Sequence, residues 1–101
     1  MKTPCVYIMA SGFQGTIYVG VTSDLPEREH QHYMKLYDGF TKKHNVNRLV
    51  WFEEFQTMEM AIQREKTIKH WVRDWKVALI EKVNPHWHRL SSETGEFIYD
   101  E

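Results

Sequence analysis

The chain has 101 residues, of which 42% are hydrophobic, so it can build one domain around one compact core and is too apolar to be disordered. A formal net charge of −1 argues against a uniformly basic nucleic-acid binder, although residues 42–76 hold eight bases against five acids and could form a local basic face. Cys5 is the only cysteine, which excludes an intrachain disulfide. With no signal-peptide pattern and no apolar run long enough to cross a membrane, we expect a cytoplasmic protein.

Two short strands open the chain. Residues 5–9 are β-branched, aromatic and apolar, and residues 16–21 repeat that character after a loop that contains two glycines. A connection of about six residues predicts an antiparallel hairpin. Gly20 lies inside the second strand, which indicates a bulge or the close approach of another group.

A helix should follow. Asp24 is a favoured N-cap residue and Glu27 stands three positions later, as in a capping box. The helix is expected to run to about residue 33 or 36. Arg28 and His32 are four residues apart and therefore share one face of it.

A third strand is expected over residues 48–55. Its apolar residues fall on both faces, which predicts that both sides of the sheet are covered. Thr57 is then placed to cap a helix over residues 58–69, in which apolar residues recur every three or four positions.

Glu65 is the exception on that apolar stripe. An unpaired buried carboxylate is costly, so Glu65 should be protonated, bound to a cation or paired with a base. The residues alone favour an ordinary ion pair with Lys69, four positions later on the same helix.

The last helix should run from about residue 71 or 74 to residue 83 and stop at Asn84 and Pro85. Trp87 and Leu90 are expected to pack back on the body, which gives one domain over residues 1–90. Residues 91–101 carry four acids and no base, and we expect an acidic C-terminal tail there. The predicted buried stripe of the helix consists of Trp71, Trp75, Ala78, Leu79 and Val83.

Tyr7 and Tyr18 each centre one of the first two strands and could lie side by side on one face of the sheet. They could be two core aromatics, or two phenols directed at one phosphate, and their spacing does not decide between these roles.

The triplets Val6-Tyr7-Ile8 and Tyr18-Val19-Gly20, followed by Arg28, His32 and Glu65, resemble the GIY-YIG nuclease superfamily in order and spacing. The resemblance covers about residues 4–90. Further stretches, at residues 20–25, 39–43 and 61–69, are similar to the small standalone bacterial members, which are described as endonucleases.

This resemblance implies an α+β fold, with a small three-stranded antiparallel sheet flanked by about three helices. It implies catalytic roles for five residues and a metal-binding role for one of them. Glu65 would bind Mg²⁺ or Mn²⁺, and Arg28 would donate to the phosphate oxygens. A tyrosine, with Tyr7 as first choice, or else His32, would take a proton from the attacking water, and Tyr18 would orient water or phosphate.

The implied activity is metal-dependent hydrolysis of a DNA phosphodiester, and selectivity for a particular DNA structure is compatible with it. DNA would be contacted through its backbone, with little reading of bases, and a homodimer is compatible with a shallow site on so small a domain. Two alternatives stay open, a nucleic-acid-binding module without turnover and, more remotely, a protein-interaction domain. The residues expected to bind the DNA backbone are Lys42, Lys43, Lys66, Lys69 and Arg73.

Overall fold

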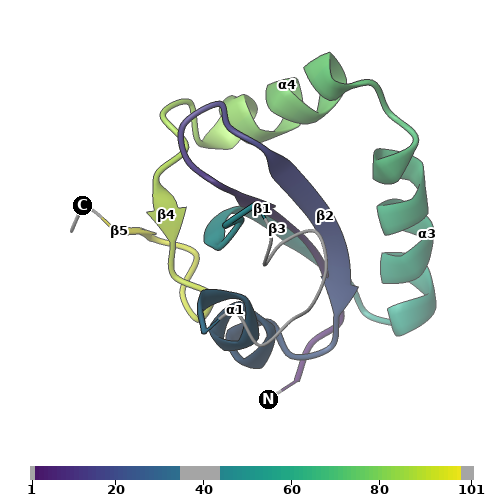
Figure 1. Cartoon of the computed structure of the whole chain (residues 1–101). Coiled ribbons are helices and arrows are strands. Elements are labelled where there is room, and N and C mark those ends of the chain that lie inside the picture. Colours follow the sequence, from purple (N-terminus) through teal and green to yellow (C-terminus); the bar gives the residue numbers. More distant parts are fainter. Residues whose placement is uncertain (1, 35–43, 99–101) are drawn as a thin grey trace.

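The computed structural model describes residues 2–34 and 44–98, and Figure 1 shows the arrangement of their helices and strands. The expected α+β fold is confirmed: a three-stranded antiparallel sheet has the strand order β2-β1-β3, with three helices around it among the described residues. In chain order the elements are β1 (Cys5–Ala10), β2 (Ile17–Thr22), α1 (Leu25–Tyr33), β3 (Arg48–Glu54), α3 (Met58–Lys69), α4 (Arg73–Val83), β4 (Arg89–Leu90) and β5 (Phe97–Ile98).

Both predicted N-caps are present. The Asp24 carboxylate accepts from the amide of Glu27 at 3.3 Å, and the Thr57 hydroxyl accepts from the amide of Met60 at 3.2 Å. These bonds satisfy backbone donors that the first helical turn leaves without a partner. The starts of α1 and α3 are therefore determined locally.

The central strand β1 is completely buried, because apolar layers cover the sheet on both sides. One layer joins Val6 and Ile8 to residues of α3 and α4, including Ile68 and Ile80. The other layer is built on the face of β1 that carries Tyr7 and Met9, together with residues from α1 and β4. The prediction that the sheet is covered on both sides is thus confirmed.

A bulge in β3 lets that strand serve both layers. Ile8 pairs with Trp51, whereas Met9 pairs with Leu49, so Val50 is an extra residue in the ladder. Val50 and Trp51 both belong to the α3 and α4 layer as a result.

The predicted buried stripe of the last helix is right for Trp71 and Leu79, which are partly buried against the core, and wrong for its other members. Trp75 is 60% exposed and Val83 is 58% exposed, whereas Ile80 is completely buried. The helix carries apolar residues on nearly all sides, so its pattern does not determine which side faces the sheet. Contact with the sheet selects the side that contains Ile80.

Trp87 and Leu90 do pack against the body, as expected, with at most 6% of either residue exposed. Beyond them the chain returns along itself, because Arg89 pairs with Ile98 and Leu90 with Phe97. Residues 91–98, expected to be part of an acidic tail, thus include a turn and a short strand that the composition did not predict. Among the described residues, no helix has the length and apolar character needed to cross a membrane.

Candidate active site

Tyr7 and Tyr18 lie on one face of the β1–β2 ladder. Tyr7 is opposite Gly20 and Tyr18 is opposite Met9, so the two tyrosines are diagonal neighbours. Their ring centroids are 6.3 Å apart. Tyr7 is completely buried, whereas Tyr18 is partly exposed. The two phenols are therefore together, as the first two strands predicted, but only Tyr18 reaches solvent.

The imidazole of His32 completes this aromatic group. His32 Nε2 and the Tyr7 hydroxyl oxygen are 3.1 Å apart and share a hydrogen bond. The His32 ring centroid is 5.8 Å from that of Tyr7 and 5.7 Å from that of Tyr18. One turn of α1 thus brings a titratable nitrogen against both tyrosines.

Gly20 provides the space for the Tyr7 ring. A Cβ atom at position 20 would lie 2.5 Å from Cζ and from the hydroxyl oxygen of Tyr7, closer than real contacts allow. The sequence indicated a bulge or a close approach at Gly20. The structure contains the close approach, and the group that approaches Gly20 is the Tyr7 ring of the candidate site.

Burial and the nearby Arg28 guanidinium lower the pKa of His32 to about 4. Both effects disfavour the imidazolium, since a charge inside the protein is poorly solvated and Arg28 repels it. His32 is only 3% exposed, which fits the dominant role of burial. At neutral pH the imidazole beside Tyr7 is therefore uncharged.

This shift predicts how stability depends on pH. The pKa of His32 is about 4 in the folded protein and near 6.5 in an unfolded chain, so between these values the unfolded state binds more protons. The contribution of His32 should be fully present above about pH 6.5 and should be lost progressively as the pH falls toward 4. Urea unfolding across this range measures the slope. His32→Gln should remove that part of the slope, and equal slopes in both proteins would contradict the prediction.

Lys69 connects Glu65 to the aromatic group at the edge of the sheet. Figure 1 shows α3 alongside the edge strand β2, and the two elements are in contact. Lys69 Nζ is 2.7 Å from Glu65 Oε2 and 5.9 Å from the centroid of the Tyr18 ring. One ammonium group therefore links the carboxylate to the exposed tyrosine. The predicted ion pair exists, and it lies at the candidate site.

The described residues could hold a divalent cation only through the single carboxylate of Glu65, with water and substrate as the other ligands. Glu65 is a single carboxylate, its side chain is 12% exposed, and residues 2–34 and 44–98 contain no cluster of three acidic, histidine or cysteine ligands. Mg²⁺ is commonly held by one or two carboxylates, with water and substrate phosphate as its other ligands. Glu65 could serve in such a site if Lys69 moved aside.

Three of the predicted backbone-binding residues lie within the described chain. Lys66 is exposed on α3, whereas Lys69 is paired with Glu65. The Arg73 guanidinium donates to the carbonyl oxygens of Gln14 and Gly15 at 2.9 and 2.8 Å, which fastens α4 to the β1–β2 loop. Arg73 therefore has a structural role that the sequence did not reveal. Lys42 and Lys43 lie outside the described residues.

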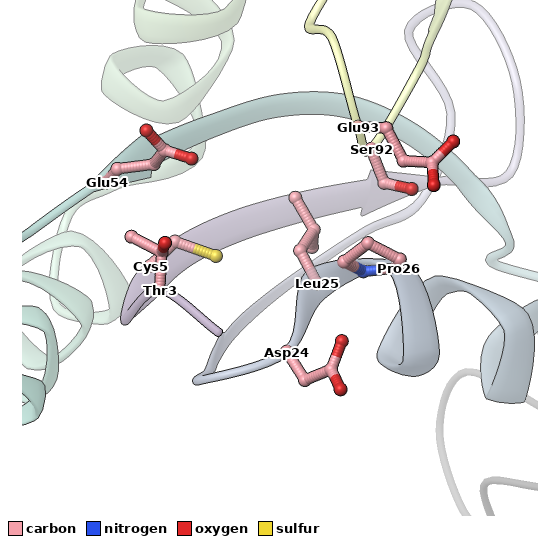
Figure 2. Close-up of a pocket in the computed structure, with 8 residues that line it drawn as sticks. All are labelled: Thr3, Cys5, Asp24, Leu25, Pro26, Glu54, Ser92 and Glu93. Carbon is pink, nitrogen blue, oxygen red and sulfur yellow. The ribbon is translucent and has the colours of Figure 1, made fainter. Parts of the chain in front are cut away.

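A separate pocket of about 290 Å³ lies where the start of α1 meets the first residues of β1 (Figure 2). It contains none of the five predicted catalytic residues. The carboxylates of Asp24, Glu54 and Glu93 line it and would repel a phosphate. Burial, reinforced by Glu54, raises the pKa of the Cys5 thiol to about 11, so Cys5 stays protonated and is a poor nucleophile.

Comparisons with known proteins identify the family of this chain. The family model of the GIY-YIG catalytic domain matches residues 3–78, which contain both tyrosines, His32 and Glu65. The chain is also similar to the UPF0213 protein BH0048 from Bacillus halodurans, whose structure was determined by NMR in solution. The two chains are 28% identical, with 80% of this chain and 85% of that chain covered and a TM-score of 0.51. No curated protein matches the chain. The chain belongs to the GIY-YIG family of nucleases.

Proposed function

We propose that this protein is an endonuclease that hydrolyses phosphodiester bonds of DNA with the help of Mg²⁺ or Mn²⁺. The observation that carries the proposal is the approach of Glu65, through Lys69, to the group formed by Tyr7, Tyr18 and His32. Tyr7, Tyr18 and His32, with Glu65 joined to them through Lys69, come from four different elements, and a purely structural arrangement gives little reason to gather them. Family membership supports the same reaction class.

Exposure distinguishes the roles of the two tyrosines. Tyr18 is the phenol that a substrate can reach, so we assign it the contact with the attacking water. Tyr7 and His32 form a buried, hydrogen-bonded pair behind it and hold its ring in place. This reverses the order suggested by the sequence, in which Tyr7 was the first choice for contact with water.

Basic side chains lie near Tyr18 and near His32. The Lys69 ammonium lies near the Tyr18 ring and would stabilise negative charge on its oxygen during proton transfer. Arg28, on the same helix α1, lowers the pKa of His32 by charge repulsion. Its planar guanidinium is suited to the non-bridging oxygens of a phosphate. A cation bound at Glu65 would offset charge on the phosphate and on the leaving oxygen.

The proposal is tested by cleavage assays with the purified protein. We expect nicking or cutting of single-stranded or branched DNA that requires Mg²⁺ or Mn²⁺ and stops with EDTA. Tyr18→Phe should remove most of this activity while it preserves the ring packing. Lys82→Gln, which removes a charge on the exposed side of α4, should cleave as the unmodified protein does. Cleavage by Tyr18→Phe at the full rate would refute the assignment.

The Glu65–Lys69 pair also favours a second candidate. With Lys69 Nζ at 2.7 Å, the carboxylate is satisfied without a metal, as in a nucleic-acid-binding module that keeps the fold and lacks turnover. Salt-dependent DNA binding without cleavage of any substrate would identify this alternative.

The geometry of the described residues and the comparisons give no support to the expected homodimer.

A further inference from the structure

A second polar pocket, of about 200 Å³, opens at the C-terminal end of α1. The described residues that line it are Tyr33, Asn47, Arg48 and Arg89. Three elements meet there, since Tyr33 ends α1, Arg48 begins β3 and Arg89 begins β4. Tyr33 directly follows His32, so this pocket and the candidate active site share one end of one helix.

Both guanidinium groups are held in place by the protein. Arg48 Nη1 donates to the carbonyl oxygen of Trp87 at 3.1 Å. Arg89 Nε is 3.5 Å from Glu29 Oε2, and Glu29 is only 8% exposed. A guanidinium carries its five N–H donors in a rigid fork, so contacts of this kind fix the direction in which the group points.

The charged side chains that line the pocket among the described residues are both guanidinium groups, which suits an anion. Glu29, the carboxylate paired with Arg89, is not one of these lining residues. Glu29 is the group that competes with an incoming anion for Arg89. The Asn47 amide adds a neutral group that can both donate and accept.

Tyr33 supplies a flat surface beside these charges. It is 57% exposed, and the Arg89 guanidinium lies 5.8 Å from its ring centroid. An exposed aromatic ring next to paired arginines suits a nucleobase stacked on the ring with its phosphate held by the guanidinium groups.

We infer that this pocket binds a nucleotide, with the phosphate between Arg48 and Arg89 and the base on Tyr33. Its source is either a neighbouring nucleotide of the bound strand or a free mononucleotide. The first source rests on the proposed function, whereas the chemistry of the pocket does not.

The experiment uses the full chain carrying Glu65→Gln, in EDTA, so that no cleavage is involved. The anisotropy of a labelled single-stranded oligonucleotide reports its affinity across a range of salt concentrations. Loss of one phosphate contact should lower the slope of log affinity against log salt by about 0.7. Adding Arg89→Gln should give this loss, whereas Lys82→Gln, an equal charge change beside a different groove, should not.

Glu29 provides a test of opposite sign. Glu29→Gln frees Arg89 from its competitor and should tighten binding severalfold, which a merely structural pair would not do. Arg89→Gln leaves the buried Glu29 without its partner and could fold poorly. The double variant Glu29→Gln, Arg89→Gln removes both charges, and it should bind the oligonucleotide as weakly as we expect of Arg89→Gln. Affinity unchanged in Arg89→Gln, or not increased in Glu29→Gln, would overturn the inference.

Two further measurements test the stacking of the base on Tyr33 and the source of the bound nucleotide. Tyr33→Leu should weaken binding roughly tenfold, whereas Tyr33→Phe keeps the ring and should bind normally. In NMR spectra, thymidine monophosphate that shifts the Tyr33 and Arg89 signals as strongly as the oligonucleotide does would assign the pocket to a free nucleotide. Shifts with the oligonucleotide alone would assign it to the strand, and shifts with neither would refute the pocket. A protein that never cleaves DNA but passes these tests would lose the proposed function and keep this site.

Discussion

Replacing Glu65 with glutamine should lower the rate of DNA cleavage by roughly 10²–10³-fold, because the amide keeps the shape of the side chain and removes the charge that would hold a cation. The fold should survive. The partner of Glu65, Lys69, is 47% exposed, and such helix-surface ion pairs contribute at most about 1 kcal/mol. Initial cleavage rates with Mn²⁺, together with thermal unfolding, measure both effects.

Glu59→Gln is the matched control for this variant. Glu59 is an exposed carboxylate in the first turn of the same helix α3, so the substitution is identical and only the place differs. We expect near-normal cleavage and a loss of a few tenths of a kcal/mol in stability from the helix dipole. If Glu65→Gln and Glu59→Gln cleave equally well, Glu65 holds no catalytic cation, and the activity comes from another group or a contaminant.

Gly20→Ala should lower the free energy of unfolding by about 3 kcal/mol, at the upper end of the usual cost of overpacking. The added Cβ would lie 2.5 Å from the Tyr7 ring, and Tyr7 is fully buried between Tyr18 and His32. The ring cannot move without displacing the candidate site, so cleavage should fall as well. Urea unfolding, followed by circular dichroism, measures the change in stability.

Gly12→Ala is the control for Gly20→Ala. Nothing lies within 4 Å of a Cβ atom at Gly12, in the loop between β1 and β2, and the residue has no positive φ. The same added methyl should be neutral or slightly stabilising there, because it only restricts the unfolded chain. Equal urea midpoints for both variants would mean that Tyr7 and Gly20 are not in tight contact.

Several features were predictable because they depend on residues only a few positions apart. The range of α3, residues 58–69, follows from a capping threonine and a helical period, and the structure has those bounds. The Asp24 cap and the three strands have the same local origin. Gly20 was identified because a glycine within a β-branched strand is unusual enough to require a reason.

Other features depended on how distant elements pack. The buried side of α4 was mispredicted in part, since that helix is apolar on nearly all sides and only contact with the sheet places Ile80 inside and Trp75 outside. The contact of Arg73 with the β1–β2 loop joins residues 58 and 59 positions apart, and no local pattern announces it.

The sequence by itself determined the three strands of the sheet, the starts of α1 and α3 and the identities of the candidate catalytic residues, because local hydrogen bonds and the residue triplets specify them. Only the tertiary structure decided their arrangement. The strand order β2-β1-β3 buries Tyr7 in the centre and leaves Tyr18 at an edge. The position of α3 beside that edge carries Glu65 and Lys69 to Tyr18. The physical reason is that exposure and proximity are properties of packed elements, and a linear spacing does not contain them.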